Sequence, residues 1–521
     1  MKEDAFSTEN IPELKRRIAE LEALVKYYEA RFRLTQHRQF GATSEKSEYD
    51  QLSFFDEAEA TADANAAEPT LVEIAKHYRK AKRTAGERLP EDLPVQIVEH
   101  DLPPEEQVCP ECGGAMHVMG RETRRELKII PAQAVIVEHI RKVYSCRDCE
   151  TDECGVPIRK APVDEPVIKG SFASPEAVAQ IMTQKFVMGV PLYRQEQEWN
   201  RNGILLSRQT ISNWVIRCAE DWLEPIYGML HEAMVINHSA LHADETVLQV
   251  LKEPGKTAQS KSYMWLYRTS GFNARGVRTS FPIVLYDYQP DRRAERPKAF
   301  LKDFKGYLHT DGYKGYHPLP EEIIIVGCWA HARRKFDEAL KSMPLKEREG
   351  SGAHIGKGYC DRLFAIERAL ADLSPKERYE KRHELAKPVL DAFFVWLNSK
   401  QYTKNATGEA VSYTLDYWKY LERYLLDGQL EISNNCAERS VKPFVIGRKN
   451  WLFANTQRGA RASAIVYSII ETAKECGLDP YRYLTYIFKN APNWNIRNDP
   501  NRLELLLPWC VPEYCKAAAS N

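Results

Sequence analysis

The sequence predicts a multidomain α+β protein in which a mixed α/β domain is interrupted by an all-helical insertion. Three observations lead to this prediction. An apolar seam of helical period opens the chain, two Cys-x-x-Cys pairs follow, and strand-like segments then alternate with helices. A length of 521 residues is enough for several buried cores, since a domain usually takes roughly 100–200 residues.

The composition narrows the class of protein. The formal net charge is zero, so any contact with nucleic acid must come from local basic patches and not from the total charge. We find no run of the ~20 apolar residues that a membrane helix needs, and the first residues lack the pattern of a signal peptide. We therefore expect a cytoplasmic protein with no membrane contact. Its cysteines are then thiols or metal ligands and not disulfides.

Residues 1–50 are predicted to form a coiled-coil helix, because apolar residues recur three and four positions apart as in an a/d seam. A helix packed on its own domain would show the same pattern. The seam favours a homo-oligomer. The seam consists of Ile11, Leu14, Ile18, Leu21, Val25, Tyr28 and Phe32.

Residues 51–95 are predicted to be an acidic, alanine-rich linker followed by a basic segment.

Two cysteine pairs predict a zinc ribbon over residues 96–165. Each pair directs two thiolates at one point, and two pairs complete a closed tetrahedral Zn²⁺ site, which is structural and not catalytic. Strand-like residues 127–130 and 134–144 can form a hairpin that brings the pairs together, and Cys154 competes as a fourth ligand. The four predicted ligands are Cys109, Cys112, Cys146 and Cys149.

Residues 166–235 are predicted to form three helices with helix-turn-helix spacing. Gly203 supplies a turn, and Ser207 caps a third helix that carries Ile211 and Trp214 on its apolar face. A plain three-helix packing unit would show the same pattern. The residues predicted to face a DNA groove are Arg208, Gln209, Ser212 and Asn213.

From residue 236 the pattern changes to strands rich in β-branched and aromatic residues. The order is three strands, a helix, a strand, and then an apolar strand that leads into a helix, which suits a mixed sheet of ribonuclease-H-like type. The predicted elements are strands 241–251, 263–268 and 281–288, helix 296–304, strands 306–310 and 323–326, and helix 329–340. The predicted divisions are a first segment of the catalytic core (236–340), a helical insertion (341–428), a second segment of the core (429–475) and a helical tail (476–521). Ser374 and Glu377 are predicted to form a capping box at the start of a helix in the insertion. A helix over 460–476 is predicted to stop at Gly477, and Asp479 to begin a shorter one.

Carboxylates lie at the ends of these predicted elements. Asp244 interrupts an otherwise apolar strand, where an unpaired charge is costly, and Asp311 follows the fourth strand. If the first and fourth strands are neighbours, the two carboxylates repel each other, and a divalent cation such as Mg²⁺ or Mn²⁺ resolves the repulsion. A third acid is expected on a later helix. Glu438 is our choice, and spacing alone leaves Glu431 and Glu422 as competitors.

The segment around Glu438 is strongly basic and contains aromatic residues. Such a combination suits a DNA backbone and unpaired bases near a cut site, although packing in the core explains Trp451 equally well. The predicted DNA-binding residues here are Arg439, Lys442, Arg448, Lys449 and Trp451.

These motifs, in this order, closely resemble the insertion-sequence-66 family of bacterial transposases. The resemblance covers most of the chain. It rests on the runs Phe40-Gly41, Cys109-Pro110-Glu111-Cys112-Gly113, Gly306-Tyr307-Leu308-His309-Thr310-Asp311-Gly312-Tyr313, Cys328-Trp329-Ala330-His331, Asn434-Asn435 with Ala437-Glu438-Arg439, and Gly447-Arg448-Lys449-Asn450-Trp451.

The resemblance implies a DDE triad of Asp244, Asp311 and Glu438, and it decides for Glu438 over its competitors. It also implies that Cys328 and His331 form the Cys-x-x-His motif seen after the second aspartate in enzymes with a helical insertion. Ser433 is a departure, because the family commonly carries an acid there.

The expected function is that of a transposase. It would bind the terminal inverted repeats of its element, cleave the ends by metal-dependent hydrolysis and join the 3′-OH to target DNA. Expected partners are double-stranded DNA, further copies of the chain and accessory proteins of the same element. Two rivals remain, a metal-dependent nuclease or resolvase that cuts without joining, and a non-catalytic DNA-binding regulator.

Overall fold

The computed structural model describes residues 134–145, 158–271, 280–399 and 405–518, with single helical positions at 17, 21, 22, 25 and 29. The chain divides into two compact units, residues 43–161 and residues 1–42 with 162–521. Within the described residues, every helix is too short or too polar to cross a membrane.

The smaller unit contains one described strand pair. β1 (Val143–Ser145) runs antiparallel to β2 (Ile158–Lys160), with Val143 opposite Lys160. The predicted strand at 134–144 is therefore wrong over most of its length, since residues 134–142 form no strand. The partner of β1 is a later segment, and the predicted partner at 127–130 lies outside the described residues.

The predicted coiled-coil seam also lies mostly outside the described residues. Of its members, Leu21 and Val25 are helical and about half exposed, at 48% and 55%. Two exposed apolar side chains four residues apart are compatible with a seam, and pairing with a second helix stays a prediction.

Three helices open the larger unit, as the sequence predicts: α4 (Pro175–Phe186), α5 (Leu192–Arg201) and α6 (Arg208–Cys218). Ser207 caps α6, since its side chain accepts a hydrogen bond from the backbone N–H of Thr210. Ile211, Trp214 and Val215 of α6 are buried. The π-helical turn η4 (Ala219–Leu223) and α7 (Glu224–Asn237) then lead to the sheet.

The sheet has the spatial order β5-β4-β3-β6-β7. β3, β4 and β5 are antiparallel neighbours, whereas β6 runs parallel to β3 and β7 runs parallel to β6. The first and fourth strands of the sheet are therefore neighbours, as the predicted meeting of Asp244 and Asp311 requires. The strands are β3 (Ala240–Lys252), β4 (Lys261–Thr269), β5 (Val284–Gln289), β6 (Gly306–His309) and β7 (Ile323–Val326).

Two predicted boundaries differ from the structure. β5 begins at Val284 and not at residue 281, because Pro282 has no N–H for the ladder and the N–H of Ile283 donates to the Thr269 side chain instead. The helix predicted at 296–304 is α8 (Glu295–Phe300), which ends early in turns such as the Phe304 N–H to Leu301 carbonyl bond.

The edge of the sheet at β5 is covered by α17 (Gln457–Glu475). The backbone N–H groups of Tyr286 and Val284 donate to the hydroxyls of Ser468 (2.7 Å) and Thr472 (3.0 Å). These bonds satisfy donors that an edge strand leaves open, and a closed edge does not pair with another chain.

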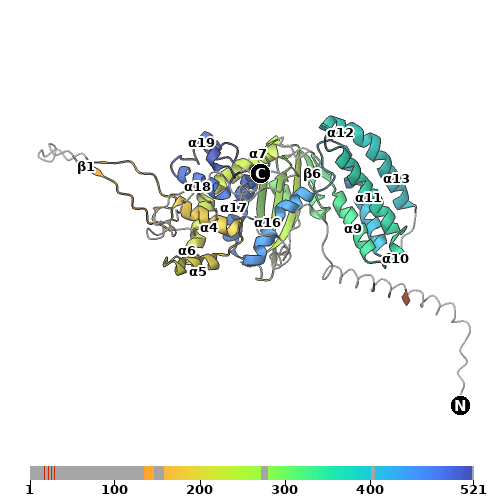
Figure 1. Ribbon diagram of the computed structural model, residues 1–521, viewed down its shortest axis with the longest axis horizontal. Coiled ribbons are helices and arrows are strands. Elements are labelled where there is room, and N and C mark those ends of the chain that lie inside the picture. The colour runs from red at the N-terminus through yellow and green to blue at the C-terminus, as the bar shows by residue number, and fades with distance from the viewer. Residues whose placement is uncertain are drawn as a thin grey trace, which may run out of the picture. The chain divides into compact units, whose positions relative to one another are not determined.

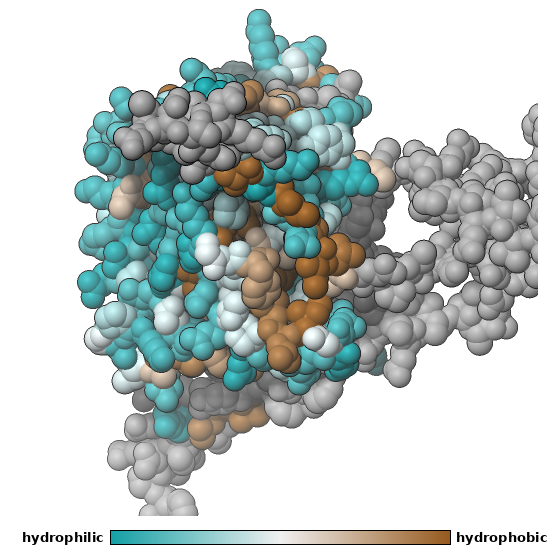
Figure 2. All heavy atoms as spheres, turned by 90° about the vertical axis from the view of Figure 1, so that its left-hand side faces the viewer, coloured by the Kyte–Doolittle hydropathy of each residue, from teal (hydrophilic) through white to brown (hydrophobic). Residues whose placement is uncertain are grey.

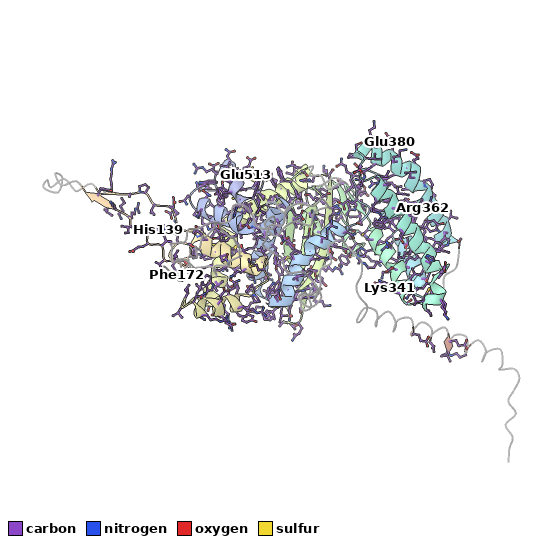
Figure 3. The ribbon with its side chains drawn as sticks, in the orientation of Figure 1. His139, Phe172, Lys341, Arg362, Glu380 and Glu513 are labelled. Carbon is purple, nitrogen blue, oxygen red and sulfur yellow. The ribbon has the colours of Figure 1, made fainter. Side chains whose placement is uncertain are left out.

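The predicted insertion is helical and has its own buried core. It follows α9 (Trp329–Lys341) and lies on the β6 side of the sheet, away from α4–α6 (Figure 1). Ser374 and Glu377 form the expected capping box. The charged side chains of Arg362 and Glu380 point outward (Figure 3). The elements are α10 (Leu345–Arg348), α11 (Gly352–Ala369), α12 (Pro375–Lys381), η6 (Arg382–Ala386), α13 (Lys387–Asn398), α14 (Ala406–Asp416), α15 (Trp418–Leu421) and η7 (Glu422–Leu425).

The chain then returns to the sheet. α16 (Asn435–Trp451) packs against β3, and the short strand β8 (Ala454–Thr456) pairs with the far end of β3. As predicted, α17 ends just before Gly477, which has a positive φ of 77°, and Asp479 caps the next helix. The tail consists of α18 (Pro480–Asn490), α19 (Pro500–Glu504) and the 3₁₀ turn η8 (Glu513–Cys515).

Candidate acid site and DNA-binding surfaces

Asp244 lies on β3, and Asp311 lies two residues past the end of β6, the parallel neighbour of β3. In the pairing of β3 with β6, Leu241 is opposite Leu308 and His242 is opposite His309. The same register, carried two residues further, sets Asp244 level with Asp311, just past the end of β6. The strand order thus brings together two acids that are far apart in the sequence.

The environment of Asp244 disfavours its charge. Burial raises the pKa of this carboxyl to about 8, and the negative charges of Glu245, Asp311 and Glu438 add to the effect. One oxygen accepts a hydrogen bond from the Glu245 N–H at 2.8 Å, which acts in the opposite direction. A cation bound among these acids would reverse the balance and hold Asp244 ionised.

Asp311 is held by the turn that follows β6. Its side chain accepts a hydrogen bond from the Tyr313 N–H at 2.9 Å, and its carbonyl accepts one from the Tyr413 hydroxyl at 3.2 Å. Gly312 has a φ of 94°, and a Cβ there would lie 2.9 Å from the Tyr417 ring. The turn therefore requires glycine, and helix α14 of the insertion supports it through Tyr413.

Glu438 lies in the first turn of α16 and accepts a hydrogen bond from Arg334 at 3.3 Å. Its Oε1 atom lies 3.7 Å from Nδ1 of His331. Both atoms are buried and lack a hydrogen-bond partner among the described residues. Burial lowers the pKa of His331 and favours its neutral ring, although the charge of Glu438 acts in the opposite direction. A neutral ring offers a nitrogen that can bind a cation.

The predicted Cys328 and His331 motif adjoins this acid. One atom each from Cys328, His331 and Glu438 lie within 4.8 Å of one another. Burial raises the pKa of the Cys328 thiol to about 11, and Sγ accepts a hydrogen bond from the Asn434 N–H at 3.2 Å. The motif therefore joins the start of α9 to the start of α16.

Asn434 anchors the start of α16 to β3, a role that its sequence context did not predict. Its Nδ2 donates to the carbonyl of Ala243 at 2.8 Å, and its Oδ1 lies 3.0 Å from Nδ1 of His242. Ala243 immediately precedes Asp244, so one amide side chain sets the position of both Asp244 and the helix of Glu438. The Asn-Asn pair before a helical segment was the available signal.

Glu245 is a second residue whose role the sequence did not predict. It is almost fully buried, forms an ion pair with Arg292 and accepts a hydrogen bond from the Tyr316 hydroxyl at 2.7 Å. Arg292 also lies 3.5 Å from the centre of the Tyr313 ring, next to Asp311. Burial raises the pKa of Glu245, and the charge of Asp311 raises it further. The ion pair of Glu245 with Arg292 therefore packs beside both Asp244 and the turn of Asp311.

The basic residues near Glu438 divide into two groups. Arg439, Lys442 and Lys449 are exposed along α16 and can meet a ligand. Arg448 donates to the Thr246 hydroxyl on β3 at 3.2 Å, and Trp451 packs edge-to-face on the core residue Phe444. Packing therefore explains Trp451 as well as DNA contact would.

The predicted recognition face of α6 is open to solvent. Arg208, Gln209 and Asn213 are exposed and Ser212 is half-buried, opposite the buried face of the helix. From the side of α4–α6, hydrophilic side chains cover most of the surface, crossed by a band of apolar ones (Figure 2). The side chain of Arg208 is 70% exposed and lies 4.0 Å from Glu196.

The predicted zinc ligands lie outside the described residues. This holds for Cys109, Cys112, Cys146 and Cys149, and for the competing Cys154. Ser433, which stands where an acid was expected, is described, and it is buried beside Asn434.

Family models match the chain along most of its length. The model described as "Transposase IS66 family" matches residues 170–462, which include the sheet, the insertion and Glu438. Further models match residues 27–98 ("Transposase C of IS166 homeodomain"), 106–150 ("zinc-finger binding domain of transposase IS66") and 468–509 ("IS66 C-terminal element"). The chain is therefore a protein of the transposase class. It belongs to the IS66 transposase family. The zinc-finger match includes all four predicted cysteine ligands and supports a structural zinc site.

Curated relatives also align with most of the chain. The chain is 31% identical to "Uncharacterized protein y4jD" of Sinorhizobium fredii, over 80% of this chain and 81% of the relative. It is 30% identical to "Uncharacterized protein y4hP" of the same organism, over 84% and 79% of the two chains. A third, "Uncharacterized protein y4qI", is 29% identical over 95% and 89%.

Proposed function

We propose that this chain is a DDE transposase that cleaves the ends of its element and joins the 3′-OH to target DNA. Asp244, Asp311 and Glu438 are its catalytic carboxylates, on a sheet of ribonuclease-H-like type. The observation that supports this most is the register of β3 with β6, which sets Asp244 level with Asp311. The charge of Glu438 also acts on the same buried Asp244.

Hard carboxylate oxygens suit Mg²⁺ or Mn²⁺, and Asp244, Asp311 and Glu438 would hold these ions. When bound, divalent ions activate a nucleophile and neutralise charge on the phosphoryl oxygens. The protein supplies position: Asn434 fixes the start of α16 against β3, and Arg334 orients the Glu438 carboxylate. Because phosphoryl transfer needs little covalent work from the protein, such positioning accounts for much of the catalysis.

Binding to DNA is proposed for two surfaces. The exposed face of α6, with Arg208, Gln209 and Asn213, would enter a major groove, since the first residues of a recognition helix contact base edges. The exposed cations of α16 would contact the backbone beside the cut. We also propose a structural zinc site with the ligands Cys109, Cys112, Cys146 and Cys149. The chain would form a homo-oligomer through the N-terminal seam, act with accessory proteins of the same element and associate with the nucleoid.

The test is cleavage of DNA that carries the element's ends, in Mg²⁺ or Mn²⁺. We expect Asp244→Asn, Asp311→Asn and Glu438→Gln each to abolish cleavage while end binding persists. Glu422→Gln is the matched control, because Glu422 is an exposed acid at the end of the insertion and should leave cleavage unchanged. Wild-type cleavage rates in the Asp244 or Glu438 variant would refute the assignment.

A pre-cleaved end separates transposition from simple cutting. The proposal predicts that the free 3′-OH is joined to a second duplex, and that the same three variants abolish joining. Cutting without joining would indicate a nuclease or resolvase. Metal-independent binding with no cleavage under any condition would indicate a regulator.

A further inference from the structure

A second group of possible metal ligands lies beside the acid site without sharing a residue with it. A ring nitrogen of His242, a carboxylate oxygen of Glu431 and the sulfur of Cys436 lie within 4.8 Å of one another. His242 is on β3, Glu431 precedes α16, and Cys436 is in the first turn of α16. A strand and a loop that are distant in sequence therefore place nitrogen, oxygen and sulfur ligands around one point.

The hydrogen bonds of Asn434 fix which nitrogen of His242 carries the proton. Asn434 Nδ2 donates to the Ala243 carbonyl, so its Oδ1 is the acceptor that faces His242 Nδ1 at 3.0 Å. His242 must then donate from Nδ1, which leaves a lone pair on Nε2. Metal-binding histidines are commonly held in this way, with the second ring nitrogen donating to an oxygen.

That lone pair faces a carboxylate. His242 Nε2 lies 4.0 Å from Glu431 Oε1, too far for a hydrogen bond. Glu431 Oε1 also accepts a hydrogen bond from the Ser270 hydroxyl at 3.1 Å. Because Nδ1 of His242 donates to Asn434, the Nε2 lone pair and this carboxylate oxygen are two acceptors that face each other. The ring also stacks on His309, with 4.4 Å between centroids, which holds its plane.

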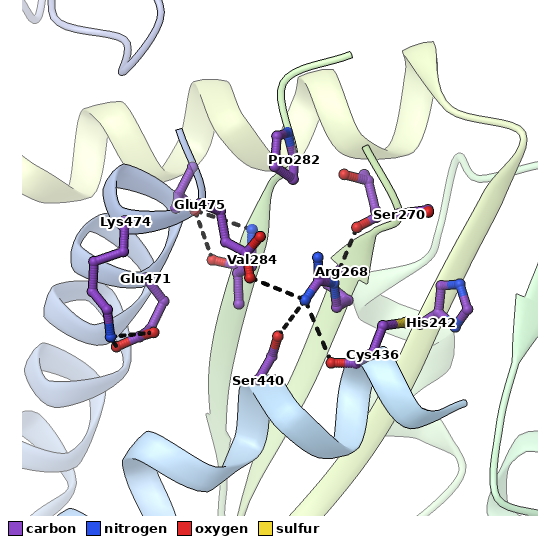
Figure 4. Close-up of polar contacts among 12 residues, drawn as sticks. His242, Arg268, Ser270, Pro282, Val284, Cys436, Ser440, Glu471, Lys474 and Glu475 are labelled. Carbon is purple, nitrogen blue, oxygen red and sulfur yellow. Dashed lines mark hydrogen bonds and ion pairs between the residues drawn. The ribbon is translucent and has the colours of Figure 1, made fainter. Parts of the chain in front are cut away.

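The charges around the cluster are compatible with a cation. Arg268 is the nearby positive group, and its NH1 donates to the Cys436 carbonyl, to Ser440 and to Glu475 (Figure 4). The ion pair with Glu475 offsets its charge. Burial lowers the pKa of His242 and raises that of Cys436, and the positive charge of Arg439 is also close enough to act on both pKa values in the lowering direction. One thiolate and one carboxylate would neutralise a divalent ion, so these arginines would face a site without net charge.

We propose that His242, Glu431 and Cys436 form a second metal site, which takes a zinc-like transition-metal ion. Thiolate and imidazole select zinc and its neighbours over Mg²⁺. Ligands ~2.0–2.3 Å from a tetrahedral zinc lie roughly 3.3–3.7 Å apart, so small side-chain movements close the site. Binding transfers the Cys436 thiol proton to solvent, and a fourth position stays open on the side of half-exposed Glu431.

Occupancy would join both ends of the loop between Glu431 and Cys436 to β3. This loop contains Asn434 and leads into the helix of Glu438. The site would therefore stabilise the return of the chain from the insertion to the sheet. It does not depend on the proposed catalytic role of the three carboxylates.

The test measures zinc per chain in the full-length protein, grown with zinc and dialysed against excess Mg²⁺. We expect Glu431→Gln and Cys436→Ala each to hold one zinc fewer than the wild type. Glu422→Gln and Cys360→Ala are matched controls, an exposed acid and a buried thiol elsewhere, and should keep the wild-type content. If Cys436→Ala does not fold, Glu431→Gln decides alone, since its side chain is 35% exposed. Equal zinc in wild type and Glu431→Gln would overturn the proposal.

Discussion

Arg382 and Glu367 form a bidentate ion pair inside the helical insertion. Arg382 Nε donates to one carboxylate oxygen of Glu367 at 2.8 Å, and NH2 donates to the other at 2.7 Å. Arg382 is fully buried, and its other donors reach the carbonyls of Tyr424, Asp427 and Leu430. The pair therefore fastens the insertion to the segment that leads back to the acid site.

Arg382→Ala should strongly destabilise the protein, because it leaves Glu367 buried with one weaker partner. Removing one member of a buried ion pair costs about 3–5 kcal/mol. Arg382→Lys should also destabilise, since an ammonium cannot reproduce the fork. The free energy of unfolding in urea measures both, with the exposed Arg362→Ala of the same insertion as control. A loss no larger than that of the control would contradict the prediction.

Asp287 should make stability depend on pH. Burial raises its pKa to about 6, although a hydrogen bond from Gln289 acts in the opposite direction. An acid with a raised pKa favours the folded state below pH ~4, and this contribution is lost as pH rises towards 6. Asp287→Asn should therefore exceed the wild type in stability above pH 6 by roughly 3 kcal/mol, at 1.36 kcal/mol per pKa unit.

The measurement is the unfolding free energy of both proteins between pH 4 and pH 7.5. The difference between wild type and Asp287→Asn should grow as the pH increases. Asp303→Asn, at an exposed site just after α8, should show no such growth. A difference that is constant with pH would show that Asp287 ionises as freely in the folded as in the unfolded chain.

Arg334→Gln should slow cleavage about fivefold to tenfold while DNA-end binding is retained. Arg334 bonds to Glu438, and both side chains are partly exposed, so the loss is about 1 kcal/mol. Arg334→Lys should restore part of the rate. The adjacent Arg333 pairs with Asp361 of α11, and Arg333→Gln should cleave normally. Single-turnover cleavage rates decide, and equal rates for the two glutamine variants would exclude the positioning role.

Gln209→Ala should weaken binding to end DNA without changing binding to random duplex. A residue that reads a base edge contributes about 1–3 kcal/mol of discrimination. Arg217→Ala, in the last turn of the same helix, is the control and should leave discrimination unchanged. Binding isotherms at fixed salt test this. If Gln209→Ala weakens both DNAs equally, α6 does not read sequence.

Much of the fold could be predicted because its signals are local. The apolar run that forms β7 was predicted with the same bounds that the structure has, and the caps at Ser207 and Ser374 begin helices as expected. Alternating burial and helix caps depend on residues that are neighbours in the sequence, so the sequence pattern predicts them. The start of β5 was wrong because Pro282 has no N–H for the ladder and the N–H of Ile283 donates to Thr269. The end of α8 was wrong because the chain passes into turns after Phe300.

The candidate site was only partly predictable. Asp244 and Asp311 stand out as acids in strand context, and the register of their strands supports their pairing. The roles of Glu245 and Asn434 depend on Arg292, Ala243 and Cys328, which approach only in the folded chain. No spacing rule encodes such long-range contacts.

The attachment of Asn434 to Ala243 has a consequence for protein synthesis. The two residues are 191 positions apart, and the whole insertion is made between Asp311 and Glu438. At ~5–20 residues per second, the ribosome adds the first two acids several seconds before the third. A nascent or truncated chain that ends within the insertion thus carries an incomplete acid set, and under the proposed function it could not cleave DNA.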